Sequence, residues 1–338
     1  MECLRVAIVG SGGMAHTRAA NVSQDPRVQI TCVGARNPVT GRTLAERYGI
    51  KCVERWEDVV RRDDVDAVFV CTHNDTHALI ARAVLEAGKH VFVEYPLAMI
   101  VDSADALLRL ASARGRVIHV GHDQAFVGWH LAIKEQSTSL DRLLAVNGVL
   151  ATPTRGGARS LWRNRALSGP PFMVGIAYVF HLVDAFGPVK WVEGTNTYER
   201  LEEGGYYRSS VSTLHAGFTS GGVAQLLYIR GYAIPRDEQE QAMMFTNGFL
   251  SYRGYVSGSR TNEGHLTRVT HAGSQRVDFP AVTLAQAGRQ NTANFLAEVL
   301  DEAPVSPPTT TARNAVAVAL AAEQAAEENG RVTLAPAV

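Results

Sequence analysis

The chain has 338 residues, and its 33 basic and 33 acidic side chains leave no formal net charge. This balance gives no reason to expect a nucleic acid or an anionic membrane as a partner. A hydrophobic content of 46% over this length predicts two packed cores rather than a disordered chain. No apolar stretch reaches membrane-spanning length, and Met1 leads straight into a predicted strand, so we expect a cytoplasmic protein.

The four cysteines fall in or near predicted strands and lack the paired spacing of metal ligands. We expect them to be small buried hydrophobes. His73 and His77 are four residues apart, but they span a loop and the start of a helix. We therefore expect no metal site there or elsewhere in the chain.

The first element is an apolar, β-branched run, Leu4 to Val9, which predicts a strand. It leads into Gly10-Ser11-Gly12-Gly13-Met14-Ala15, a G-x-G-x-x-A turn. Gly10 allows the tight turn, Gly12 lets the backbone approach a pyrophosphate, and Ala15 lets the next helix pack closely. That helix, from about Met14 to Val22, offers its first amides, at Gly13 and Met14, to phosphate groups.

The segment after the second strand bears on which dinucleotide binds. This strand, Val28 to Gly34, is followed by Ala35-Arg36-Asn37, where a carboxylate would normally hold the ribose 2′-hydroxyl of NAD. A guanidinium favours a 2′-phosphate, so we predict NADP in preference to NAD, with Arg36 as the phosphate ligand and Thr40 or Arg42 as helpers. The alternative is that Arg36 is an ordinary solvated arginine.

Strands and helices alternate up to residue 122, which predicts a doubly wound parallel sheet with helices on both faces. We therefore expect a dinucleotide-binding domain over residues 1–122. The predicted helices are Pro38 to Tyr48, Trp56 to Arg62, Asp75 to Ala87 and Asp102 to Arg114, and the further strands are Asp66 to Cys71, His90 to Glu94 and Val117 to Gly121.

From residue 123 the pattern changes to one helix, Phe126 to Lys134, and longer strand-like runs. They predict an open, mostly antiparallel sheet in a second α/β domain over residues 123–338. An alanine-rich helix, 312–329, closes the chain, and its small side chains predict tight packing back on the first domain. The predicted strands of the second domain are Leu143 to Thr152, Ser209 to Phe218, Val223 to Arg230 and Phe249 to Val256.

Four segments together resemble the glucose-fructose oxidoreductase, inositol dehydrogenase and rhizopine-catabolism (Gfo/Idh/MocA) group. The first is the Gly10 to Ala15 turn, and the second is residues 71–77, Cys-Thr-His-Asn-Asp-Thr-His, which resemble the group's T-P-N-x-x-H loop. Glu94-Tyr95-Pro96-Leu97-Ala98 stands where the group has E-K-P-L-A. Trp162-Arg163 and His181-Leu182-Val183-Asp184 are similar to its W-R and H-x-x-D elements.

The resemblance covers nearly the whole chain and implies a Rossmann domain followed by a domain whose open sheet usually serves in homodimers or homotetramers. It implies a small-molecule substrate: a sugar, cyclitol or similar polyol hydroxyl that is oxidised, or the matching carbonyl that is reduced. It also implies cofactor contacts from Thr72, Asn74, His77 and Glu94, in addition to the glycine turn.

Two departures from the group affect the proton chemistry. When a hydride leaves an alcohol carbon, a base must take the hydroxyl proton. The group uses the lysine of E-K-P, helped by a histidine and by an aspartate four residues before it. This sequence has Tyr95 for the lysine and Ala177 for the aspartate, and it keeps His181 and Asp184. We predict that Tyr95 protonates a forming alkoxide and that His181, oriented by Asp184, restores the proton.

These assignments have structural alternatives. A phenol has a reference pKa near 10, so it donates a proton more easily than it accepts one. Tyr95 could instead be a packed aromatic that needs one hydrogen-bond partner. His181 and Asp184 are three apart on one helical face, a spacing that structural pairs also use.

Further polar residues bear on the substrate side and on the choice of function. His122 could face the substrate or act as a hinge, and Trp162, Arg163 and Arg159 could line the substrate side. Three functions stay open: an NADP-linked oxidoreductase acting on a sugar-like or other polar molecule, a lyase or epimerase that keeps the dinucleotide bound, and a cofactor-binding protein without catalysis.

Overall fold

The computed structural model describes residues 3–153, 160–234, 236–256 and 262–335. The chain divides into two compact units. Unit 1 comprises Met1–Asp123 and Gly288–Arg313, and unit 2 comprises Gln124–Ala287 and Asn314–Val338. A late segment, Gly288–Arg313, thus returns to unit 1, whereas the sequence pattern placed all of 123–338 in the second domain. The last helix, α11 (Thr309–Glu328), begins in unit 1 and continues in unit 2.

Unit 1 contains a six-stranded sheet in the order β3-β2-β1-β4-β5-β6, and every neighbouring pair is parallel. This confirms the predicted doubly wound sheet. Because the strands are parallel, the loops that follow β1, β4, β5 and β6 all leave the same edge. The strands are β1 (Leu4–Val9), β2 (Val28–Gly34), β3 (Lys51–Val53), β4 (Ala67–Val70), β5 (His90–Val93) and β6 (Ile118–Val120).

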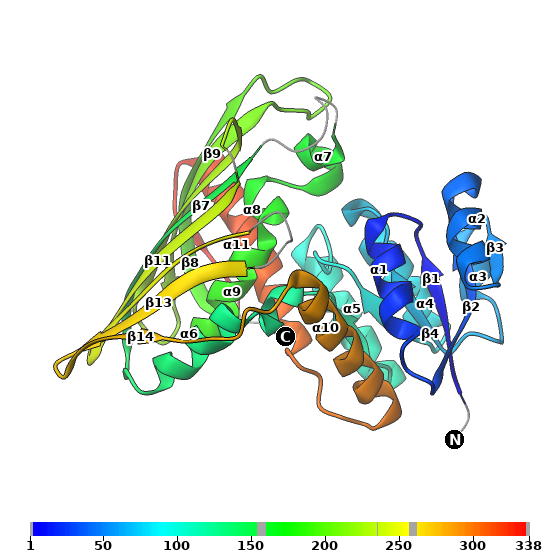
Figure 1. The fold of residues 1–338 in the computed structure, drawn as a ribbon. Coiled ribbons are helices and arrows are strands. Elements are labelled where there is room, and N and C mark those ends of the chain that lie inside the picture. Colours follow the sequence, from blue (N-terminus) through cyan, green and yellow to red (C-terminus); the bar gives the residue numbers. More distant parts are fainter. Residues whose placement is uncertain (1–2, 154–159, 235, 257–261, 336–338) are drawn as a thin grey trace. The chain divides into compact units, whose positions relative to one another are not determined.

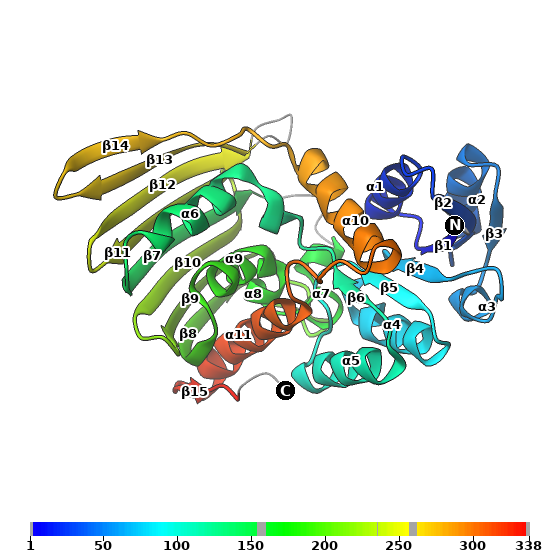
Figure 2. The same cartoon turned by 90° about the horizontal axis from the view of Figure 1, so that it is seen from below.

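Helices cover both faces of this sheet (Figure 2). Alternate residues of β1 divide between two cores: Val6 and Ile8 pack with α1, α2 and α10, and Ala7 and Val9 pack with α3, α4 and α5. Phe295 of α10 lies edge-on to Phe69 of β4, with ring centroids 5.2 Å apart. The helices are α1 (Gly13–Val22), α2 (Pro38–Arg47), α3 (Trp56–Val60), α4 (His77–Glu86), α5 (Val101–Arg114) and α10 (Leu284–Leu300).

Unit 2 is built on a nine-stranded sheet in the order β14-β13-β12-β11-β7-β10-β9-β8-β15. All neighbouring pairs are antiparallel except β7 and β10, which confirms the predicted mostly antiparallel sheet. The strands are β7 (Leu143–Pro153), β8 (Val189–Glu199), β9 (Ser209–Phe218), β10 (Val223–Tyr232), β11 (Asp237–Phe245), β12 (Gly248–Val256), β13 (Asn262–Thr270), β14 (Gly273–Val277) and β15 (Val332–Thr333).

One face of the large sheet carries the helices of unit 2, and the other carries none of them (Figures 1 and 2). On β7, Val146 and Leu150 are buried on the covered face, and Val149 points the other way and is 38% exposed. Met244 of β11 is likewise 46% exposed. The helices are α6 (Gly128–Thr138), α7 (Arg165–Ser168), α8 (Pro171–Val174) and α9 (Ile176–Phe186).

Three local predictions differ from the structure. The single helix predicted over Phe126 to Lys134 is a 3₁₀ turn, Asp123–Phe126, followed by α6. The helix predicted from Asp75 likewise begins as a 3₁₀ turn, Asn74–Thr76, before α4. Cys3 is exposed, against the expectation that every cysteine is buried.

Within the described ranges, none of the helices combines the length and the apolar character that crossing a bilayer requires.

Candidate active site

The turn after β1 has the shape of a phosphate cradle. Gly10 has φ +121°, and a Cβ there would lie 2.2 Å from the carbonyl oxygen of Cys71, so only glycine fits. A Cβ on Gly12 or Gly13 would meet no atom within 4 Å, so the space beside this backbone is open. Gly12 caps α1 without any side-chain hydrogen bond, and Ala15 is fully buried against the sheet. The α1 N-terminus therefore suits a pyrophosphate.

The end of β2 suits a 2′-phosphate. Arg36 is exposed there, and the Asn37 side chain caps α2 by accepting from the amide of Val39 at 3.0 Å. Ser11 of the glycine turn shares a 2.7 Å hydrogen bond with Thr40 of α2. A guanidinium and two hydroxyls are thus presented by the ends of β1 and β2, and residues 34–43 contain no carboxylate that would repel a phosphate.

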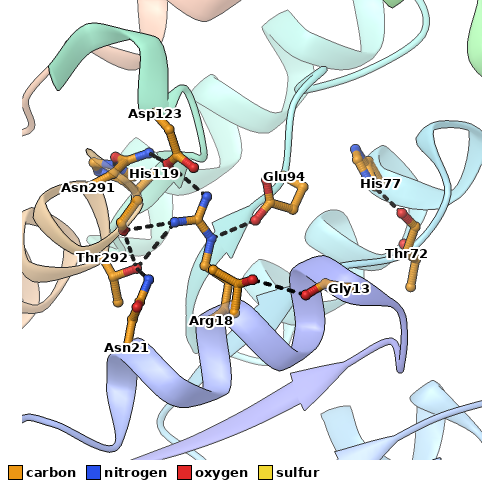
Figure 3. A network of polar contacts seen from close by, with 12 residues as sticks. Gly13, Arg18, Asn21, Thr72, His77, Glu94, His119, Asp123, Asn291 and Thr292 are labelled. Carbon is orange, nitrogen blue, oxygen red and sulfur yellow. Dashed lines mark hydrogen bonds and ion pairs between the residues drawn. The ribbon is translucent and has the colours of Figure 1, made fainter. Parts of the chain in front are cut away.

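The loop after β4 is tied to the loop after β5. His77 Nδ1 lies 2.8 Å from the carbonyl oxygen of Pro96. Its Nε2 lies 3.2 Å from the carbonyl oxygen of Thr72 (Figure 3). Burial lowers the pKa of His77, so the neutral ring donates to one carbonyl, and Pro96 is the closer. Thr72 is half-buried and Asn74 is buried. The structure thus places His77 as a link between two loops, whereas its contact with a cofactor stays a prediction.

Tyr95 and His122 lie together at the ends of the neighbouring strands β5 and β6. Their rings stack with centroids 5.1 Å apart and an interplanar angle of 12°. Tyr95 is partly exposed and its ring also packs against one of the two cores of unit 1, while His122 is fully buried. A phenol and an imidazole are thus held face to face at the edge where the cradle opens.

Arg18 of α1 is fully buried between two carboxylates (Figure 3). Its Nε donates to Glu94 at 2.6 Å and its Nη2 donates to Asp123 at 2.9 Å. Burial alone would lower the pKa of Arg18, but the two carboxylates hold it above its ordinary value. The Glu94 carboxylate is therefore paired with Arg18, and its contact with a cofactor stays a prediction.

The same network anchors α10 to unit 1. Arg18 Nη1 donates to the carbonyl oxygen of Gly288 at 3.0 Å, and Asn291 Nδ2 donates to Asp123 at 2.8 Å. His119 of β6 contacts the Glu298 carboxylate at 2.9 Å. Because Glu94 precedes Tyr95 and Asp123 follows His122 in the chain, Arg18 holds the neighbours of both stacked rings.

Unit 2 holds a second group, a buried chain of polar side chains on α6, α9 and β11. Asp184 Oδ2 lies 2.7 Å from His130 Nε2 and 2.7 Å from Lys134 Nζ. His130 Nδ1 then contacts His181 Nδ1, and His181 Nε2 lies 2.9 Å from the side-chain amide of Gln241. Asp184 therefore orients His130 and not His181, which corrects the predicted pairing. His130 therefore lies between Asp184 and His181 in the chain of contacts.

The protonation of this chain follows from its burial. Burial lowers the pKa of both histidines, so each neutral ring carries one N–H. His130 uses its Nε2–H for Asp184, so its Nδ1 accepts from His181. His181 Nε2 then carries a lone pair and lies 2.9 Å from Gln241 Oε1. This lone pair is satisfied only when the Gln241 amide turns to present its NH₂ group. Burial would raise the pKa of Asp184, but the hydrogen bonds from His130 and Lys134 lower it to about 2.

The predicted substrate-side residues differ in their surroundings. Trp162 is 53% exposed, and Arg163 is buried at 6% exposure. Arg159 lies outside the described residues. Over the ranges given above, no three His, Cys, Asp or Glu side chains are placed to hold a metal ion.

Sequence reasoning missed two of the connecting residues, Arg18 and His130. Arg18 lies on the helical face of Ala15, Ala19 and Val22, and a charged residue on such an apolar face is a readable signal of a buried partner. His130 has no comparable signal, because its partners lie on a different helix 51 and 54 residues away.

Comparison with known proteins agrees with this architecture. Residues 4–122 match the family model for the Gfo/Idh/MocA oxidoreductase family, NAD-binding Rossmann fold. Biliverdin reductase A of Mus musculus is 32% identical over 208 residues, which are 61% of this chain and 65% of that protein. Inositol 2-dehydrogenase of Rubrobacter xylanophilus is 26% identical over 292 residues, 79% of each chain. The match thus spans slightly less than two thirds of the mouse relative's length.

Two solved structures show the same fold over almost the full length. Biliverdin reductase from Synechocystis sp., in complex with biliverdin and NADP⁺, has a TM-score of 0.85 at 24% identity and covers 96% of this chain and 99% of its own. Levoglucosan dehydrogenase in complex with NADH has a TM-score of 0.84 at 15% identity and covers 99% of this chain and 100% of its own. With the glycine cradle and the parallel sheet that the family model describes, residues 4–122 belong to the Gfo/Idh/MocA family of oxidoreductases.

Proposed function

We propose that this protein is an NADP-dependent oxidoreductase that reduces a carbonyl or an equivalent unsaturated centre of a polar small molecule. The observation that carries the proposal is the stacked pair Tyr95 and His122, which stands at the ends of β5 and β6 on the edge where the phosphate cradle opens. The cofactor supplies the hydride, and the protein must supply the matching proton.

The residues of unit 1 divide between binding and proton supply. The amides at Gly13 and Met14 would hold the pyrophosphate, and Arg36 with Thr40 would hold the 2′-phosphate. A neutral phenol is a donor rather than a base near neutral pH, so Tyr95 suits the reductive direction, in which an alkoxide-like oxygen takes up a proton. The fully buried His122 fixes the phenol ring from one side.

The histidine chain of unit 2 supplies the second part of the proposed relay. His181 carries its lone pair on Nε2 beside a rotatable amide, so it can accept or return a proton when Gln241 turns aside. Its Nδ1–H rests on His130, and the imidazolium that forms is stabilised through His130 by the Asp184 carboxylate. This is the role we propose for His181 and Asp184.

Two substrate classes deserve testing. Sugar-like carbonyls follow from the family and from the relatives named inositol 2-dehydrogenase. A biliverdin-type acceptor is favoured by the mouse and human relatives named biliverdin reductase A and by the fold shared with the Synechocystis enzyme that was solved with biliverdin and NADP⁺.

The test is to follow NADPH oxidation with biliverdin and with a panel of keto sugars and inosose, and then NADP⁺ reduction with the matching alcohols. The proposal predicts that NADPH is oxidised in the presence of at least one acceptor. It also predicts that the matching alcohol reduces NADP⁺ more slowly. Substrate loss without any net change in cofactor absorbance would support a lyase or epimerase instead. NADPH binding without turnover of any compound would support a protein that only binds the cofactor.

A double variant probes how the site departs from its family. Tyr95→Lys with Ala177→Asp restores the side chains that the resemblance implies for polyol oxidation. If the substrate is sugar-like, this variant gains oxidation of a polyol. If the acceptor is of the biliverdin type, the variant loses reduction and gains nothing.

We also propose that the helix-free face of the unit 2 sheet is the surface of a homodimer or homotetramer. Val149, Val223, Met244 and Val269 are 36–46% exposed on this sheet. Such apolar side chains on a broad sheet favour burial against a second copy. Sedimentation equilibrium with Met244→Glu tests this, since an inserted charge would dissociate the assembly.

A further inference from the structure

The described part of the chain has three buried arginines, and they differ in whether a carboxylate pairs with the guanidinium group. Arg18 lies between Glu94 and Asp123, and Arg313 pairs with Asp105 at 2.7 Å. Arg163 is 6% exposed, yet it has no ion pair and no side-chain hydrogen bond to any residue described, and its Nη2 is completely buried. Arg163 Nη2 is thus held out of water without an acceptor, which is unfavourable, and a bound anion would remove this cost.

Polar side chains gather in two rows on the helix-covered face of the unit 2 sheet. Strand register sets Arg230 opposite Ser210 on one side and opposite Thr152 on the other. The next row sets Tyr228 opposite Ser212, and the row after that is apolar, with Leu226 opposite Leu214. The polar rows therefore occupy one end of the sheet, at the carboxyl ends of the parallel strands β7 and β10.

Tyr207 connects Arg163 with these rows. Its amide donates to the carbonyl oxygen of Arg163 at 2.9 Å. Its hydroxyl and that of Ser210 are buried and find no hydrogen-bond partner in the part of the chain that is described. Burial raises the pKa of Tyr207, and the positive charges of Arg230 and Arg163 act in the opposite direction.

Among the residues that the structure describes, no carboxylate pairs with Arg163. A cavity of about 20 Å³ beside Tyr228 and Gln239 has room for a single water, which can serve the buried amide of Gln239. A water molecule carries no charge to offset Arg163. The nearby carboxylate of Glu323 is already bound by Arg165, Asn196 and Tyr198.

We propose that Arg163, Tyr207 and Arg230 form a carboxylate-binding site in unit 2. A guanidinium fork, a phenol and a second guanidinium together suit the two oxygens of a carboxylate. The identification of this carboxylate as part of the substrate rests on the proposed function, and it narrows the substrate to an organic acid. A neutral polyol would leave the positive charge of Arg163 without a counter-ion.

The first experiment compares thermal unfolding midpoints without any ligand. Arg163→Met replaces an unmatched buried charge by an apolar chain of similar length, so it raises the midpoint. Arg18→Met, the matched control, leaves the carboxylates of Glu94 and Asp123 without their cation and lowers the unfolding midpoint. If Arg163→Met lowers the midpoint as Arg18→Met does, Arg163 has an internal partner and the site does not exist.

The second experiment adds sodium propionate, with sodium chloride and propionamide as matched controls. At saturation, propionate raises the wild-type midpoint by about 2 °C or more, because it binds only the folded protein. Propionamide does not, and Arg163→Met abolishes the propionate shift. Arg208→Met, which removes only an exposed pair with Glu199, keeps the shift. An equal propionate shift in Arg163→Met and in wild type overturns the proposal, and so does its absence from both.

Neither experiment measures turnover. A propionate shift that depends on Arg163 in a protein that turns over no substrate would refute the proposed function and leave the carboxylate site standing. Turnover of a substrate by a protein that shows no propionate shift would refute the carboxylate site and leave the proposed function standing.

Discussion

The imidazole of His122 lies parallel to the phenol of Tyr95, with ring centroids 5.1 Å apart. Both rings are held at the ends of adjacent parallel strands, β5 and β6. Arg18 reaches the residue beside each ring, Glu94 before Tyr95 and Asp123 after His122. Helix α1, whose first amides we propose as cofactor ligands, therefore also holds the residue beside each ring.

This connection predicts how Arg18→Lys behaves. Lysine keeps the charge but cannot bind both carboxylates as a fork, so we expect a loss of about 2 kcal/mol or more in the free energy of unfolding. We also expect a lower kcat with little change in KM, because the rings shift while the substrate contacts remain. Arg313→Lys disturbs the other fully paired buried arginine of unit 1 and serves as the control. Equal losses of kcat in the two variants would show that Arg18 has only a structural role.

The histidine chain predicts a difference between two variants that both touch Asp184. His130→Gln breaks the path from Asp184 to His181, and we expect kcat to fall about 10-fold or more, with a shifted pH profile. Lys134→Gln removes the other partner of Asp184 but leaves that path intact, so the effect is smaller. NADPH affinity, measured by fluorescence titration, stays the same in both variants. The relay is refuted if the two variants lose activity equally.

Arg36→Ala tests the choice of cofactor. Loss of a charge-assisted contact to the 2′-phosphate raises the Kd for NADPH by about 10- to 100-fold, which corresponds to roughly 1.4 to 2.8 kcal/mol. The Kd for NADH is unchanged, because NADH has no 2′-phosphate. Arg47→Ala, at the far end of the following helix α2 (Pro38–Arg47), is the control. Equal weakening of both cofactors would place Arg36 elsewhere than at the 2′-phosphate.

The parallel sheet and the glycine cradle could be predicted from the sequence, because glycine geometry and the alternation of apolar runs are local properties. The contact between Asp184 and His130 could not be predicted from the sequence. The spacing of Asp184 from His181 suggested an i,i+3 pair, but His130 arrives from α6 and takes the carboxylate instead. The return of Gly288–Arg313 to unit 1 was equally hidden, since Thr292 and Glu298 find partners more than 170 residues away.

Buried neutral histidines predict the pH dependence of stability. Burial lowers the pKa of His77, His130 and His181 in the folded protein, whereas the unfolded chain has a pKa near 6.5 at each. Below about pH 6.5 the unfolded chain therefore binds more protons, and stability falls as the pH falls. Each histidine contributes up to about 1.4 kcal/mol per pH unit. Urea unfolding between about pH 7 and pH 5 measures the slope, and His77→Gln makes it shallower. An unchanged slope in that variant would mean that His77 is protonated in the fold.

The most direct test of the whole account is Tyr95→Phe, assayed for NADPH binding and for turnover of an accepted substrate. Phenylalanine keeps the ring beside His122 and removes only the hydroxyl. If Tyr95 is the proton donor, kcat falls by about 10² to 10⁴-fold while the Kd for NADPH stays within about twofold of wild type. An unchanged kcat would show that the phenol is a packing residue and that the proton comes from elsewhere.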